Sequence, residues 1–256
     1  MPRTAVEHEF SQGLFLDYYA AEAPVRPLVV CIHGGGFISG SRQDARCLQS
    51  AEILVPAGFN MASLSYSLAS PDDRFGMWPR NFCNVVDAMA WLVEHAEELG
   101  FDASRIGLLG FSAGCCLSGL YCFGGRGLLT HVGHEAPWVE PACLFGFYGP
   151  YDFRRRQPER RSTDENINRD HSPAYWLNAG ADCTPPVYHV QGDEDVIVYP
   201  DQAGAFEADY QALGLDFTAR LEPGFGHSFA PRDRNADGLE LDVSAEMLEF
   251  FRKHLG

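Results

Sequence analysis

Ser112 is the residue of this 256-residue chain that is best placed for covalent chemistry. It stands in the pentapeptide Gly110-Phe111-Ser112-Ala113-Gly114, which matches the pattern G-x-S-x-G. An apolar stretch precedes it (RIGLLG, 105–110), and a run rich in alanine, cysteine, leucine and serine follows. This context predicts a strand, a tight turn and a helix, with the serine side chain held out from the sheet at the helix N-terminus. The pentapeptide alone occurs by chance in many sequences, so the interpretation depends on partners for Ser112.

A glycine run that begins 79 residues before Ser112 (112 − 33) could stabilise negative charge. His33-Gly34-Gly35-Gly36-Phe37 directly follows the apolar stretch 28–32. Glycines let backbone N–H groups point into a cavity, and fixed N–H donors are what an oxyanion needs. The run lacks the lysine and serine or threonine of a P-loop and the spacing of a dinucleotide fingerprint. The glycine run and the pentapeptide are therefore a more specific pair than either motif alone.

A serine hydroxyl at its normal pKa is a weak nucleophile, so a base and an orienting acid are required. Three neighbouring acids compete at the end of an apolar strand: Asp193, Glu194 and Asp195. We favour Asp195, because it lies in the loop just past the strand, and interpret the other two as loop-shaping or solvated. His227 lies in a glycine-flanked loop (PGFGHSF) 32 residues after Asp195 (227 − 195). Its loop follows the next strand, where sites of parallel sheets assemble.

Strand-like and helix-like stretches alternate along the chain, which predicts βαβ units and a mainly parallel sheet. Strands are expected at residues 14–20, 28–32, 59–68, 105–110, 142–148, 186–191 and 217–221. Helices are expected at residues 84–99, 202–213 and 244–254. The first helix has apolar residues at steps of 4, 3, 4 and 3, and Gly100 supplies its stop. The 14–20 stretch is typical of an edge strand that need not be parallel.

One polar segment interrupts this alternation, at residues 152–171 (DFRRRQPERRSTDENINRDH). It holds five arginines within 154–161 and has no apolar period. We interpret it as a solvated surface excursion, and the alternative is a mobile lid over a site. The length of the chain predicts a single domain, 1–256, that contains this insertion.

The composition excludes several classes of protein. The net charge is −16, from 19 basic and 35 acidic residues, which disfavours nucleic acid and anionic membranes as partners. No apolar run approaches the roughly 18 residues of a membrane span, and the start MPRTAVEHEFSQG does not resemble a secretory signal. The eight cysteines form no CxxC pair, so we expect reduced thiols in a cytoplasmic protein and no metal. Residues 233–238 begin like a calcium loop, but position 12 is Ser244 instead of glutamate, which favours a solvated turn.

The order serine, aspartate, histidine, with the HGGGF and GFSAG elements, resembles the α/β-hydrolase superfamily. Within it the chain resembles the hormone-sensitive-lipase-like esterases and, more closely, the short acetyl-xylan and feruloyl esterase-like branch of carbohydrate esterases. The resemblance extends over residues 13–255 and includes three further segments: 65–69 (SYSLA), 105–107 (RIG) and 172–174 (SPA). It implies an α/β fold with a mainly parallel central sheet, helices on both faces and a small or absent cap. Cys115-Cys116 departs from the glycine that relatives often carry there.

The resemblance also implies a role for each residue. Ser112 is the expected nucleophile, His227 the base and Asp195 the acid that orients it. The expected oxyanion donors are the backbone N–H groups of Gly35, Gly36 and Ala113. Four aromatic side chains either line the substrate pocket or pack in the core: Trp78, Phe111, Tyr148 and Trp176.

These residues predict a serine carboxylesterase that hydrolyses short-chain acyl esters, with acetyl esters of saccharides as a candidate class. Its expected partner is a small-molecule ester, and the mechanism needs no cofactor. Two alternatives stay open. One is an amide hydrolase, formamidase or peptidase-like, on the same fold, and the other is a non-catalytic ligand-binding protein.

Overall fold

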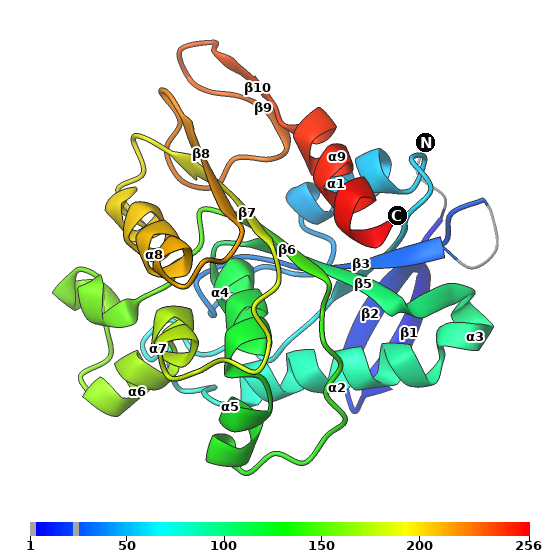
Figure 1. The fold of residues 1–256 in the computed structure, drawn as a ribbon, viewed down its shortest axis with the longest axis horizontal. Coiled ribbons are helices and arrows are strands. Elements are labelled where there is room, and N and C mark those ends of the chain that lie inside the picture. The colour runs from blue at the N-terminus through cyan, green and yellow to red at the C-terminus, as the bar shows by residue number, and fades with distance from the viewer. Residues whose placement is uncertain (1–3, 23–25) are drawn as a thin grey trace.

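A computed structural model describes residues 4–22 and 26–256, and its centre is a twisted sheet (Figure 1). Within the described residues the sheet has eight strands in the order β1-β2-β4-β3-β5-β6-β7-β8. The strands are β1 (Val6–Ser11), β2 (Leu14–Tyr19), β3 (Arg26–Ile32), β4 (Asn60–Leu64), β5 (Phe101–Phe111), β6 (Cys143–Phe147), β7 (Val187–Gly192) and β8 (Phe217–Glu222). From β4 to β8 all pairs are parallel, whereas β2 is antiparallel to both β1 and β4.

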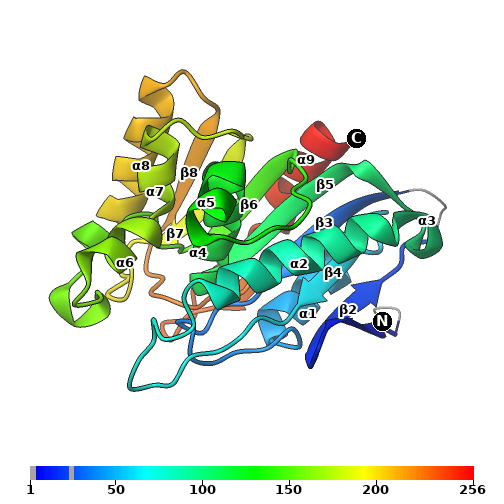
Figure 2. The ribbon, with the colours of Figure 1, turned by 90° about the horizontal axis from the view of Figure 1, so that it is seen from below.

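Helices cover both faces of the sheet (Figures 1 and 2). One face carries α1 (Ala45–Leu54) and α9 (Ser244–Leu255). The other carries α2 (Arg80–Glu94), α4 (Ala113–Gly119), α5 (Gly125–Val132), α7 (Pro173–Asn178) and α8 (Asp201–Ala212). Strands at the centre are apolar throughout because both of their faces are covered; Leu28 to Ile32 of β3, for example, are 0% exposed.

The predicted parallel sheet and its flanking helices are confirmed, with three differences. The strand at 14–20, whose direction the sequence leaves open, is antiparallel, and it is not the edge that the sequence predicts, because β1 pairs along its outer side. The helix predicted at 84–99 begins at Arg80 and breaks at His95, and α3 (Ala96–Leu99) continues to Gly100, which is left-handed with φ 74°. The strand predicted at 59–68 ends at Leu64.

The segment 152–171 is more buried than its polar sequence predicts. It contains two short 3-10 helices, Phe153–Arg155 and Pro158–Arg160, and α6 (Glu165–Asp170). Phe153 and His171 are 0% exposed and anchor the segment, whereas residues 154–155, 158–159 and 163–166 are exposed, as expected for a surface excursion. Single apolar residues between polar neighbours anchor the segment, and such a pattern has no helical or strand period. Of the domain predicted at 1–256, residues 1–3 and 23–25 lie outside the described part.

The calcium-like segment 233–238 forms the turn of a small hairpin between β9 (Arg232–Arg234) and β10 (Glu240–Asp242). The side chain of Asn235 accepts hydrogen bonds from the N–H groups of Asp237 and Leu239 and so shapes the turn. No group of three or more histidine, cysteine or acidic side chains suited to a metal ion occurs in residues 4–22 and 26–256. All eight cysteines are free, and seven of them are buried. Among the helices of the described segments, none has the length and apolarity needed to cross a membrane.

Three buried histidines make the fold sensitive to acid. Burial is the main cause that lowers the pKa of His171 to about 3 and those of His33 and His189 to about 4. The pKa of an unfolded histidine is about 6.5. Between these values the unfolded chain binds more protons than the folded chain. The stability that the neutral histidines contribute is therefore complete above about pH 6.5 and is lost as the pH falls toward 4.

We expect the free energy of unfolding to fall steeply between pH 6.5 and 4.5, with each of these histidines contributing up to about 1.4 kcal/mol per pH unit. His171 lies against the rings of Trp78 and Phe75, and both of its ring nitrogens lack a hydrogen-bond partner. The His171→Leu variant should therefore fold and lose roughly a third of this pH dependence. Urea unfolding at several pH values measures it, and identical slopes in both proteins would contradict the explanation.

Candidate active site

Ser112 lies at a sharp turn between β5 and α4, in a backbone conformation that most residues avoid (φ 49°, ψ −115°). The two glycines of the pentapeptide allow this turn. A Cβ atom on Gly110 would lie 2.5 Å from Cys115 Cα, and one on Gly114 would lie 2.1 Å from Ile32 O. Helix α4 therefore packs directly on the end of β3, and any larger residue would push it away.

The glycine run lies beside this turn. A Cβ atom on Gly34 would be 3.3 Å from Ser112 Cβ. Gly35 and Gly36 both have positive φ, 114° and 62°, which explains why glycine stands there. Tyr66, from the SYSLA segment, donates its hydroxyl hydrogen to His33 O at 3.1 Å and so holds the start of the glycine run in place.

Ser112, His227 and Asp195 form one chain of hydrogen bonds. The distance from Ser112 Oγ to His227 Nε2 is 2.8 Å, and that from His227 Nδ1 to Asp195 Oδ2 is 2.7 Å. With the imidazole neutral and protonated at Nδ1, Ser112 donates to Nε2 and Nδ1–H donates to the carboxylate. Ser112 is 9% exposed and Asp195 is 2% exposed, so solvent reaches mainly the serine and histidine end.

Asp195 is held as a carboxylate by several donors. Its Oδ1 accepts the N–H groups of Ile197 and Val198 at 2.8 and 2.9 Å. Burial acts to raise the pKa of Asp195, but the hydrogen bond and charge of His227 and these two N–H groups outweigh it and lower the pKa. The two competing acids lie elsewhere: Asp193 accepts Gly224 N–H, and Glu194 is exposed.

A buried polar network behind Asp195 has no clear signal in the sequence. Gln191 Nε2 donates to Asp195 Oδ2 at 2.8 Å, and its Oε1 lies 3.2 Å from His189 Nε2. His189 Nδ1 in turn lies 2.8 Å from the Tyr151 hydroxyl. Period-two spacing of Gln191 and His189 on a strand places both on one face of β7, and this is the only pattern that could have indicated the network.

Tyr148 contacts the loop that carries His227. Its hydroxyl donates to Phe229 O at 2.7 Å, and its ring meets the His227 imidazole edge-to-face at 4.7 Å. Tyr148 and Phe111 are 0% exposed, so both are core residues and do not line a solvent-filled substrate pocket. Trp78 and Trp176 are half-buried.

Cys115, directly after the pentapeptide, is accommodated by glycines on the facing segment. A Cβ atom on Gly146 would lie 2.6 Å from Cys115 Sγ, and one on Gly149 would lie 2.3 Å from it. Burial raises the pKa of the Cys115 thiol to about 12, so it is not a thiolate near neutral pH. Cys115 therefore contributes packing under the turn and takes no part in the hydrogen-bond chain of Ser112.

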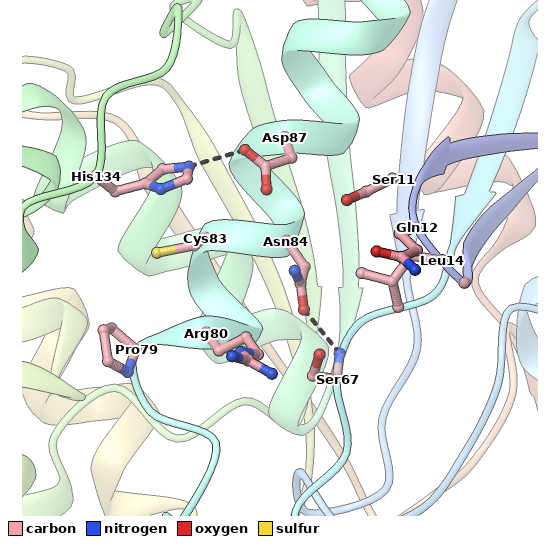
Figure 3. Close-up of a pocket in the computed structure, with 11 residues that line it drawn as sticks. Ser11, Gln12, Leu14, Ser67, Pro79, Arg80, Cys83, Asn84, Asp87 and His134 are labelled. Carbon is pink, nitrogen blue, oxygen red and sulfur yellow. Dashed lines mark hydrogen bonds and ion pairs between the residues drawn. The ribbon is translucent and has the colours of Figure 1, made fainter.

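A separate pocket lies between the N-terminal end of α2 and the β1–β2 turn (Figure 3). Its volume is about 640 Å³. An ion pair between His134 and Asp87 at 2.8 Å and a hydrogen bond from Ser67 N–H to Asn84 Oδ1 at 3.0 Å shape its wall. None of the three residues of the hydrogen-bond chain lines this pocket.

This arrangement has the chemical parts of nucleophilic acyl transfer. An imidazole that accepts a serine proton while a carboxylate holds its other nitrogen raises the nucleophilicity of the hydroxyl. Glycine N–H groups beside the serine, with a helix N-terminus, can stabilise an oxyanion.

Comparisons with known proteins agree with the fold. The family model BD-FAE matches residues 16–210. The chain is 29% identical over 229 residues to esterase LipC of Mycobacterium tuberculosis, covering 79% of this chain and 53% of LipC. The present chain spans about half the length of the first curated relatives that it matches. The butyrate-bound esterase Est2 of Thermogutta terrifontis superposes with a TM-score of 0.77 at 20% identity, covering 98% of this chain and 92% of Est2. A truncated carbohydrate esterase from gut microbiota gives 0.74 at 20% identity, with 99% and 96% covered.

The order of the strands, the turn at Ser112 and the structural neighbours define an α/β-hydrolase fold, as the sequence predicts. Since the family model matches three quarters of the chain, the chain belongs to the BD-FAE family.

Proposed function

We propose that the protein is a serine carboxylesterase that hydrolyses short-chain acyl esters. The observation that carries this proposal is the hydrogen-bond chain from Ser112 through His227 to Asp195. Ser112 Oγ attacks the ester carbonyl, and His227 Nε2 takes its proton and gives it to the leaving alcohol. The acyl group stays on Ser112 until a water molecule, deprotonated by His227, releases the acid. Asp195 holds the Nδ1–H tautomer and stabilises the imidazolium.

In this proposal, the backbone N–H groups of Gly35, Gly36 and Ala113 donate hydrogen bonds to the negatively charged oxygen of the tetrahedral intermediate. The positive φ angles of the two glycines and the position of Ala113 at the first turn of α4 support this assignment. Removing one such donor typically costs about 10²–10³ in kcat.

We propose acetyl esters of saccharides as the substrate class, supported by the likeness to BD-FAE and to a carbohydrate esterase. We also propose a single domain in which residues 152–171 form a fixed cap beside the site. Hydrogen bonds from Arg156 to Ile197 O and from Gln157 to Val196 O support this role. The free cysteines support a cytoplasmic location.

Hydrolysis of 4-nitrophenyl esters from acetate to octanoate tests the function. We expect turnover that is highest for the two- to four-carbon acyl groups. Preference for long, aggregated esters would contradict the short-chain proposal. The matched acetanilides test the alternative, since faster hydrolysis of amides than of esters would identify an amide hydrolase. A folded protein that hydrolyses neither class would point to a binding protein.

A further inference from the structure

Three arginines near the Asp195 loop have no acidic partner. Other arginines of the 152–171 segment do form ion pairs; Arg154, for example, lies 2.8 Å from Asp152. Arg74, Arg156 and Arg160, in contrast, form no ion pair with any residue in the part of the chain that the structure describes. Arg80, Arg126 and Arg252 also form no ion pair among the described residues, but they are exposed, whereas Arg156 is buried and Arg74 and Arg160 are half-buried. In a chain of net charge −16, partly buried cations without acidic partners require an explanation.

Arg156 is the buried member of this arginine cluster. It is 9% exposed, and its guanidinium lies over the Phe153 ring, 5.2 Å from the centroid. One nitrogen, Nη2, donates to Ile197 O at 2.7 Å. Its Nε is buried and has no hydrogen-bond partner. Burying a charged donor is costly unless it is satisfied, and no group in the described residues satisfies this N–H.

Arg156 lies between the two loops that carry the site. On one side it holds Ile197, whose N–H binds the Asp195 carboxylate. On the other side Phe153 packs against Phe37, which ends the glycine run, with ring centroids 6.2 Å apart. The guanidinium is therefore close to the edge of the sheet where Ser112 stands.

Arg74 and Arg160 add positive charge around the Arg156 guanidinium. Phe75, the residue after Arg74, meets the Phe153 ring edge-to-face at 5.8 Å. Burial lowers the pKa of Arg156 to about 10, and the charges of Arg160 and Arg74 add to that effect, while the charge of Asp195 opposes it. Because these positive charges repel one another, an anion bound among them would be stabilised.

We propose that Arg74, Arg156 and Arg160 form a subsite for an anionic group, a carboxylate in the simplest case, on the ester substrate. The inference rests on the proposed esterase function and names its substrate class. A guanidinium presents paired N–H donors that match the two oxygens of a carboxylate. The cluster also offsets the repulsion that a chain of net charge −16 exerts on an anionic substrate.

Two pairs of esters at fixed ionic strength test the subsite. The first pair is 4-nitrophenyl hydrogen glutarate and 4-nitrophenyl valerate, which places the charge on the acyl side. The second is 4-acetoxybenzoate and 4-acetoxybenzamide, which places it on the alcohol side. After correction for spontaneous hydrolysis, we expect kcat/KM to favour the anionic member of at least one pair by about tenfold or more.

The double variant Arg74→Gln/Arg160→Gln should remove most of this preference. Arg252→Gln/Lys253→Gln is the matched control, because it removes two exposed positive charges on α9 and should leave the preference unchanged. No preference in the unmodified enzyme, or a preference that survives in the double variant, would overturn the subsite and leave the esterase function intact.

A measurement without turnover separates the two proposals. Glutarate and 4-hydroxybenzoate should bind the Ser112→Ala variant in calorimetry, and the added double substitution should weaken binding by tenfold or more, on the order expected for charge-assisted hydrogen bonds. If no ester is hydrolysed, the esterase function fails. Binding that depends on the arginines then still supports the anion subsite, and its absence overturns it.

Discussion

The Ser112→Ala variant should lose on the order of 10⁶ in kcat for 4-nitrophenyl acetate. The loss is this large because covalent attack requires the hydroxyl that now donates to His227 Nε2 at 2.8 Å. Alanine leaves the left-handed turn and the glycine run in place, so KM should change little. Stopped-flow or steady-state release of 4-nitrophenolate measures the effect, with unfolding curves to show that the variant is folded.

Ser118→Ala is the matched control for this variant. Ser118 is a buried serine of the same helix, α4, and its hydroxyl donates to Gly114 O at 2.9 Å. We expect this variant to keep most of the activity. Comparable losses in both variants would indicate that the effect of Ser112→Ala arises from damage to α4 instead of from the missing nucleophile.

The Asp195→Asn variant should lose about 10⁴ in kcat. An asparagine amide in place of the carboxylate favours the wrong imidazole tautomer and cannot stabilise the imidazolium. The buried donors around Asp195, the N–H groups of Ile197 and Val198, would also face a neutral oxygen. Steady-state release of 4-nitrophenolate measures this loss.

Glu194→Gln provides the matched control for Asp195→Asn, because it neutralises an exposed acid in the same loop. Its activity should stay within about twofold of the original, as for most surface substitutions. A larger loss with Glu194→Gln than with Asp195→Asn would show that the orienting acid is wrongly assigned.

The sequence carried enough information to predict the sheet and the positions of the three residues at its edge. Strands such as β3 are apolar on both faces, which only a covered parallel sheet explains. Ser112, Asp195 and His227 each follow a parallel strand of this sheet, and parallel strands end at one edge. Contact between Ser112 and His227 then follows from the topology, although the residues are 115 positions apart.

Features that depend on packing between distant segments could not be predicted. The edge strand β1 (VEHEFS) has three polar residues in a row and no strand-like alternation, so its pairing depends on β2. Residues 152–171 look solvated, since single anchors such as Phe153 and His171 leave no periodic pattern. Arg74 and the pair Arg156 and Arg160 come from two segments about 80 positions apart. A local sequence pattern cannot predict a contact between segments so distant in the chain.

The most direct test of the proposed nucleophile is covalent labelling of the active protein with a serine-directed fluorophosphonate, followed by peptide mapping in a mass spectrometer. We expect one label per chain, on Ser112, appearing in step with the loss of esterase activity and strongly slowed in His227→Ala. Loss of activity with the label on any other residue, or full activity with Ser112 labelled, would contradict the account.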